Sequence, residues 1–279
     1  ELGTTLQNSL SIGKERYEQK IATVYLRRKR SDVLKELPTI NMIESWSKLN
    51  KDQQEYYDEA LQSGVNGFQK MRRAAFIGKD SEKIAQIEQI CEDARNNGEK
   101  VIIFSFFKED VVFKLQKLLP HVASKAITGD ITSSDKRQQI IAEFSSSATE
   151  SVLVCQIGAA GYGLNIQAAN QVIICEPQLK PSTESQAISR AYRMGQTRNV
   201  TVYHLLTEDS IDETMIDKLN YKQELFDKYA DDSLVAELMT KSAEKDVTKA
   251  ASQSSIKQQI LEAEQARLKR KNKQLMSEK

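Results

Sequence analysis

From residue 100 onward, short apolar runs alternate with segments whose apolar residues recur at helical spacing. The apolar runs are VIIFS at 101–105, KAITG at 125–129, VLVC at 152–155, VIIC at 172–175 and VTVYHLL at 200–206. The periodicity between and after them predicts helices over 109–119, 133–144, 183–193 and 210–229. Continuous apolar strands separated by helices are typical of a parallel sheet with helices on both faces. We therefore predict an α/β fold whose functional loops lie at the carboxyl ends of the strands.

The residues before this region show mostly helical spacing. Helices are predicted over 50–62 and 80–97, and TINMIESWS at 39–47 is compatible with a short strand. Gly98 stands where a helix stop is expected. The change in rhythm divides the chain near residue 98.

Apolar content falls again after about residue 231, where Lys, Glu, Gln, Ser and Ala dominate. Ile256, Ile260 and Ala263 are spaced for one amphipathic helix. The basic run at 269–273 is interpreted as a solvated helix face, with a nucleic-acid contact as the alternative. The predicted organisation is a mostly helical segment at 1–97, the α/β domain at 98–230 and a charged helical or disordered tail at 231–279.

Composition narrows the class of protein without identifying a partner. The 279 residues include 40 basic and 39 acidic ones, so a net charge of +1 gives no hint of nucleic-acid binding. No apolar run approaches the roughly 18 residues of a membrane span, and the first residues lack a secretory signal, so we expect no membrane partner. Three cysteines without CxxC spacing and two histidines predict reduced thiols and no metal site. The chain begins with Glu1, so we expect a piece of a longer protein.

Two loops that follow apolar runs carry chemistry suited to phosphate. Ser105 and Lys108 offer a hydroxyl and an ammonium at a strand end, where they can grip a phosphate backbone, although a serine there is as often a helix cap. The loop GAAGYGLN at 158–165 allows a close backbone approach to a ligand, and a plain tight turn is the alternative. Its GxxGxG order is not a dinucleotide fingerprint, and it lacks the Gly-Lys-Ser/Thr of a Walker A loop.

A third segment carries arginines at regular spacing. Gln186, Arg190 and Arg193 are spaced i, i+4, i+7 and would share one helix face, while Ala187 and Ala191 would pack inward. Two guanidinium forks on a rigid helix suit a polyphosphate clamp. The alternative is a pair of solvated arginines that meet nearby carboxylates.

Together these segments resemble the motifs of a known family. QAISRAYRMGQTRNVTVYHLL at 186–206, preceded by VLVCQIGAAGYGLNIQAANQVIICEP at 152–177, resembles motifs VI and V of the Swi/Snf family of DNA-dependent ATPases, in helicase superfamily two. EKVIIFSFF at 99–107 resembles its motif IV, and YLRRKRSDVLKELP at 25–38 resembles the segment after its first lobe. The similarity covers roughly residues 25–230.

The resemblance implies a RecA-like C-terminal helicase lobe, preceded by a helical segment and followed by a helical tail. Members of this family resemble two such lobes that bind ATP and Mg²⁺ in the cleft between them, with the Walker A lysine and DExH carboxylates on the first lobe. Neither motif is present in this chain, so its expected partner is that N-terminal lobe. By resemblance, Arg190 and Arg193 are arginine fingers and Gln186 faces the nucleotide.

The resemblance also implies double-stranded DNA, held by its phosphate backbone, as a partner, and a DNA-bound protein complex as a further one. Ser105 and Lys108 match the backbone-gripping region of motif IV. Where family members carry a hydroxyl in motif V, this chain has Gln156, Ile157 and Gly158, so Gln156 and the Gly158 backbone are the candidate DNA contacts. Among the remaining motif V positions Ala160 replaces one glycine, while Gly161, Gly163 and Asn165 match.

Two other functions remain open at this stage. One is a catalytically silent module that binds nucleic acid or protein and retains only this lobe. The other is an α/β nucleotide-binding enzyme that uses the glycine loop itself. The compact lobe favours a bacterial or archaeal cytoplasm, with the nucleus as the alternative.

Overall fold

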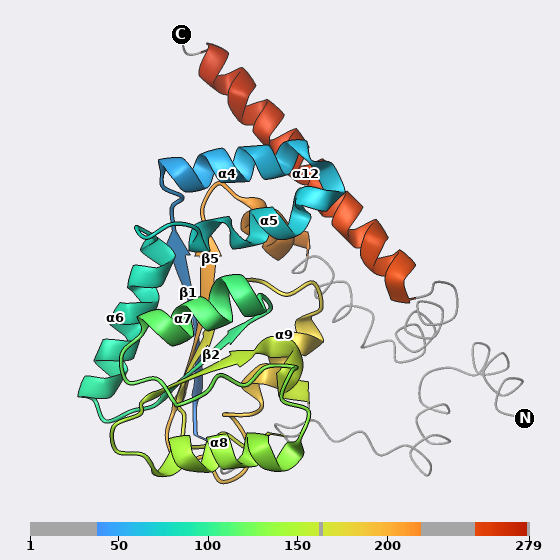
Figure 1. Ribbon diagram of the computed structural model, residues 1–279. Coiled ribbons are helices and arrows are strands. Elements are labelled where there is room, and N and C mark those ends of the chain that lie inside the picture. The colour runs from blue at the N-terminus through green and yellow to red at the C-terminus, as the bar shows by residue number, and fades with distance from the viewer. Residues whose placement is uncertain (1–37, 162–163, 219–248, 278–279) are drawn as a thin grey trace, which may run out of the picture.

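The computed structural model describes residues 38–161, 164–218 and 249–277 (Figure 1). Its centre is a five-stranded sheet in the order β1-β5-β4-β2-β3, and every pairing is parallel. The strands are β1 (Ile40–Ser47), β2 (Val101–Ser105), β3 (Val152–Gln156), β4 (Gln171–Ile174) and β5 (Val200–Thr207). The predicted parallel α/β fold is confirmed.

Helices surround this sheet, and a group of them lies beyond its carboxyl end (Figure 1). The longer helices are α4 (Lys51–Gln62), α5 (Phe68–Arg73), α6 (Glu82–Asn96), α7 (Phe113–Leu118), α8 (Ser134–Ser146), α9 (Pro181–Ile188) and α12 (Lys249–Ser277). Short turns link some of them: η1 (Gly64–Gly67), η2 (Ala74–Phe76), the π-helical η3 (Lys108–Val112) and η4 (Ile157–Gly161). Residues 211–218 are also helical.

The sheet takes in more of the chain than the predicted division at residue 98 allows. Strand β1 forms its edge and pairs with β5 from Ile40 opposite Val200 to Ser47 opposite Thr207. Helix α6 packs on the sheet as well, through Ile87 and other apolar side chains. The segment predicted as a helical connection therefore contributes a strand and a covering helix to this domain.

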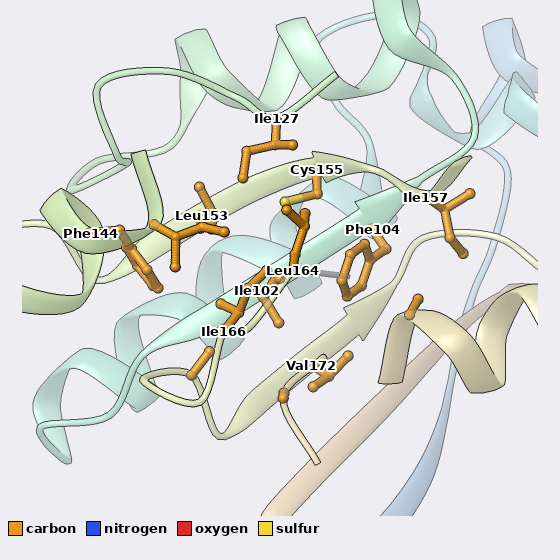
Figure 2. Close-up of a cluster of buried hydrophobic side chains, with 14 of the residues drawn as sticks. Ile102, Phe104, Ile127, Phe144, Leu153, Cys155, Ile157, Leu164, Ile166 and Val172 are labelled. Atoms are coloured by element: carbon orange, nitrogen blue, oxygen red, sulfur yellow. The ribbon is translucent and has the colours of Figure 1, made fainter. Parts of the chain in front are cut away.

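The period of two along β2 explains why the sheet is covered on both faces. Ile102 and Phe104 point into one core, which α8, α9 and η4 cover (Figure 2). Val101 and Ile103 point into the opposite core, beneath α6 and α7. Since all four side chains are fully buried, the strand reads as a continuous apolar run.

A third apolar cluster fixes the C-terminal helix to the domain. Ile260 and Leu261 of α12 pack with Tyr57 of α4, Phe68 of α5 and other buried side chains. At the same place Glu264 is fully buried; its carboxylate accepts hydrogen bonds from Tyr57, Thr214 and Arg267. Of the three residues predicted to form an apolar stripe on this helix, Ile256 and Ile260 pack against the domain.

Most predicted helices agree with the structure within a few residues; of the helix predicted over 210–229, residues 211–218 are helical and the rest lies outside the described residues. Helix α9 differs from its prediction. It was expected over 183–193 and instead begins at Pro181 and ends at Ile188. After Ile188 the N–H groups of Arg190 and Ala191 bond three residues back, as in a turn, and the carbonyl of Arg190 accepts the Ile166 N–H at 3.0 Å. The run at 125–129 forms only an isolated bridge, between Ile127 and Cys155.

Candidate functional site

The loops after β2, β3 and β4 form one continuous surface at the carboxyl end of the sheet. They are called here the β2 loop (105–108), the β3 loop (156–165) and the β4 loop (175–180). Strand order brings them together, since β2 lies between β4 and β3. Gln156 joins two neighbours: its Nε2 donates to the Phe106 carbonyl at 3.5 Å, and its Oε1 accepts the Gly129 N–H at 3.0 Å.

Ser105 ends β2 and is fully buried. Its hydroxyl donates to Oε2 of Glu176 at 3.0 Å and accepts the Phe107 N–H at 3.1 Å. The predicted phosphate contact of this hydroxyl stays a prediction, and it would require these bonds to be exchanged. The next residue, Phe106, is 46% exposed and presents its ring on the same loop.

Lys108 lies nearer the surface and is held by carboxylates. Its ammonium lies 3.0 Å from Asp130 and 3.2 Å from Glu109. The hydrogen bonds to Asp130 and Glu109 raise the pKa of Lys108. An incoming phosphate would therefore compete with two carboxylates for this ammonium.

The β3 loop opens as the 3₁₀ turn η4. Gly158 is exposed, and a Cβ built on it would have nothing within 4 Å, so its backbone is open to a ligand. Asn165 is also exposed, Gly161 ends the turn, and Gly163 lies outside the described residues. These placements leave the motif V assignments as predictions.

Gln186, Arg190 and Arg193 do not share one helix face. Gln186 is exposed on α9, whereas both arginines are half-buried in the turn that follows it, named here the arginine turn (189–196). Ala187 and Ala191 are fully buried, as their spacing predicted. The arginines are thus presented by a turn that the core anchors on both sides.

Hydrogen bonds join the arginine turn to residues 166–169, which follow the β3 loop. Besides the bond from Ile166 to Arg190, the buried amide of Gln196 donates to the carbonyls of Gln167, Ala169 and Ala191 at 3.1–3.2 Å. The sequence singled out the segment that contains Gln196, but not this role of its side chain. The segment that follows the loop with the predicted DNA contacts is therefore hydrogen-bonded to the turn with the arginines.

Gly195 shapes the end of that turn. It adopts a φ of +92°, which favours glycine, and a Cβ there would lie 2.8 Å from Nε2 of Gln167. Met194 beside it is 69% exposed. The turn thus depends on glycine for its conformation and presents an apolar side chain next to Arg193.

Sequence reasoning missed a buried charged cluster that connects these loops to α5. Glu176 follows β4 and is fully buried, and burial raises the pKa of its carboxyl, which Arg72 partly offsets. Arg72 is itself buried, which lowers its pKa; it donates to the Pro177 carbonyl at 2.6 Å. The sequence signal was a charged residue directly after the apolar run VIIC.

A second buried pair supports the strand ends from the other side. Nζ of Lys83 lies 3.3 Å from Oδ2 of Asp212 and also donates to the carbonyls of Cys175 and Leu205. The Cys175 carbonyl directly follows β4, and the Leu205 carbonyl lies in β5. The lysine therefore connects α6 to both strands. Lys83 was read only as part of a helix, because nothing in its sequence context distinguishes it from a surface lysine.

Two classes of site find no support in the part of the chain that the structure describes. No group of three or more His, Cys, Asp or Glu side chains there is placed to hold a metal ion. None of the helices in these ranges combines the length and apolar character that a membrane span requires.

Comparison with known proteins supports the domain type. Residues 82–195 match the helicase conserved C-terminal domain. An uncharacterized ATP-dependent helicase of Mycoplasma genitalium is 27% identical over 81% of this chain, and the chromatin-remodeling ATPase INO80 of Debaryomyces hansenii is 32% identical over 52%. The chain spans 25% and 11% of the lengths of these two relatives.

Solved structures agree with this domain type. The C-terminal part of the Fun30 ATPase domain superposes with a TM-score of 0.58 at 20% identity, covering 65% of this chain and 88% of that one. The Sulfolobus solfataricus SWI2/SNF2 ATPase core in complex with dsDNA gives 0.55 at 25% identity, covering 83% of this chain and 55% of that one. The chain thus has the parallel-sheet fold of these C-terminal ATPase domains, carries a match to the helicase conserved C-terminal domain and is similar in sequence to ATPases of the Swi/Snf type.

Proposed function

We propose that this chain is the second motor lobe of an ATP-dependent DNA translocase. In this proposal Arg190 and Arg193 act on a triphosphate held by an N-terminal lobe, while the β2 and β3 loops hold the phosphate backbone of duplex DNA. The observation that carries it is the bonded connection between residues 166–169, which follow the β3 loop, and the arginine turn, made by Ile166 and Gln196. Movement of DNA against this loop would then change the position of the arginines.

The reaction proposed for the two-lobe protein is phosphoryl transfer from ATP to water. Its transition state carries negative charge on the γ-phosphoryl oxygens, and guanidinium groups supplied from a facing lobe stabilise that charge. Mg²⁺ would be bound with the nucleotide on the N-terminal lobe and would supply charge neutralisation there. Arg190 and Arg193 suit the complementary part, because a half-buried turn anchored at both ends limits their freedom.

The nucleotide role is tested in a protein that carries both lobes. We expect Arg190→Ala and Arg193→Ala each to lower DNA-stimulated ATP hydrolysis by roughly 10³–10⁵-fold while largely sparing ATP binding. The matched control is Arg198→Ala, because the Arg198 side chain is exposed and its guanidinium donates to the Gly98 carbonyl, away from the arginine turn. Near-normal turnover in both finger variants would overturn the assignment.

The DNA role is tested on the 279-residue chain itself. Fluorescence anisotropy with a labelled duplex of arbitrary sequence should show binding that weakens steeply as salt rises, because phosphate contacts release counterions. Equal affinity for unrelated sequences is expected, since phosphate contacts carry no base information. Absence of binding at low salt, together with no ATPase activity in the two-lobe protein, would favour a partner-binding module that retains only this lobe.

A further inference from the structure

Glu176 receives three hydrogen bonds from two different loops. Ser105 donates to its Oε2 at 3.0 Å, and the Phe106 N–H donates to its Oε1 from the β2 loop. Nε2 of Gln178 donates to Oε1 at 3.0 Å from the β4 loop. One buried carboxylate therefore links the β2 loop to the β4 loop at the end of the sheet.

Arg72 braces the same junction from the helical layer. Its guanidinium lies 5.5 Å from the centre of the Phe106 ring and 5.3 Å from that of Phe107, and it bonds the Pro177 carbonyl next to Glu176. Contact of a guanidinium with ring faces favours a fixed ring position. The half-exposed Phe106 is therefore held in place through its backbone by Glu176 and through its ring by Arg72.

The two loops lead toward the two proposed partners. The β2 loop presents Phe106 and Lys108 on the surface assigned to DNA. The β4 loop leads into α9, since the Gln178 N–H donates to Oε1 of Glu184 at 2.6 Å, and α9 ends at the arginine turn. Glu176 lies where these two paths meet.

We propose that Glu176 is a positioning residue that couples DNA engagement at the β2 loop to the arginine turn. This inference rests on the proposed function and adds a second connection to the one made through the β3 loop. A carboxylate suits the role because its two oxygens accept all three donors at once. A glutamine in its place would turn an NH₂ group toward at least one of those donors.

The test compares Glu176→Gln with wild type in the two-lobe protein. ATPase rates are measured without DNA and across a series of duplex concentrations. We expect basal turnover and the KM for ATP to change less than about twofold, while the ratio of DNA-stimulated to basal turnover falls by at least about tenfold. This split separates positioning from general damage, because a loss of folded protein lowers both rates together.

Glu264→Gln is the matched control. Glu264 is equally buried and its carboxylate also accepts bonds from several donors, but it lies at the α12 anchor, away from both loops. We expect it to lower the melting temperature without changing the DNA stimulation ratio. If both variants change that ratio equally, or if Glu176→Gln leaves it unchanged, the inference is overturned.

A double-mutant cycle with Ser105→Ala strengthens the test. If the serine acts through Glu176, the double variant should lose no more stimulation than Glu176→Gln alone. Additive losses would mean that Ser105 acts separately, and would contradict a shared unit. If wild type itself shows no DNA-stimulated hydrolysis, it is the proposed function that fails, and the two failures are therefore distinguishable.

Discussion

Glu184 makes the stability of this lobe depend on pH, and one substitution at this residue is expected to remove that dependence. Its side chain is 15% exposed, accepts the Gln178 N–H, and lies 3.8 Å from Nε2 of His204. Burial raises the pKa of Glu184 to about 7, and Glu176 adds to the rise while the Gln178 bond and Arg72 oppose it. His204 adds little positive charge above neutral pH, because burial lowers its own pKa.

The sign follows from proton linkage. The folded chain holds the Glu184 proton more tightly than the unfolded chain, whose pKa is near 4.5, so stability falls as pH rises from about 4.5 to 7. A difference of about 2.5 pKa units corresponds to about 3 kcal/mol in full, of which about 2 to 3 kcal/mol falls between pH 5 and 8. Glu184→Gln keeps an acceptor for Gln178 and removes the titration.

Urea unfolding of wild type and Glu184→Gln at pH 5 and pH 8 measures this difference. The quantity compared is the gain in unfolding free energy of the variant over wild type. We expect this gain to be larger at pH 8 than at pH 5 by about 2 to 3 kcal/mol. Glu88→Gln, on the exposed face of α6, is the matched control and should show no such pH-dependent gain. A Glu184→Gln gain that is equal at both pH values, or absent at pH 8, would refute the reasoning.

Three further outcomes are expected in unfolding experiments on the same chain. Lys83→Met should cost about 3–5 kcal/mol because it leaves Asp212 buried without its cation, and adding Asp212→Leu should recover most of that loss; a cost below about 1 kcal/mol would contradict the buried pair. Gly195→Ala should cost about 1–3 kcal/mol and lower the melting temperature, because φ is +92° and a glutamine amide lies 2.8 Å from the new Cβ. Tyr57→Phe should cost about 1–2 kcal/mol and speed proteolysis within α12, since it removes one donor to Glu264; unchanged cleavage would argue against the anchor.

The strands were predictable because their apolar runs are continuous. VIIFS at 101–105 and VLVC at 152–155 coincide with β2 and β3 to within a residue, since burial on both faces leaves no polar alternation. Strand β1 was harder to place in the sheet. It forms an edge, where Met42 is 56% exposed and Ile43 43%, so its sequence carries little sign of a buried partner strand.

The arginine turn shows where sequence spacing stops being informative. The i, i+4, i+7 pattern of Gln186, Arg190 and Arg193 fits a helix, but helical spacing cannot report a carbonyl that is captured from outside. The Arg190 carbonyl accepts a hydrogen bond from the N–H of Ile166, which lies 24 positions earlier. No local pattern encodes this pairing. The sequence therefore singles out the residues proposed for the site, while the backbone that presents them is not predictable from it.

Buried charged groups were the least visible from sequence. Nothing in the sequence distinguishes three such residues from surface charges: Glu176, Lys83 and Glu264. Each is fully buried and forms hydrogen bonds with residues more than 40 positions away. Their burial is tolerable only because every one is met by several partners. Such a partnership is a property of the tertiary fold, so it appears only once the elements are assembled.

The lobe thus offers two routes from the proposed DNA surface to the arginines, and they differ in chemistry. One passes along the β3 loop and ends in main-chain carbonyls bonded by Ile166 and Gln196. The other passes through Glu176 and α9, and its acceptors are the side-chain carboxylates of Glu176 and Glu184. Because every acceptor of the first route is a main-chain carbonyl, substitutions there should disturb folding together with coupling. The route through Glu176 can be weakened separately by Glu176→Gln. If the two connections act in parallel, this variant should stay folded and lose only part of the DNA stimulation.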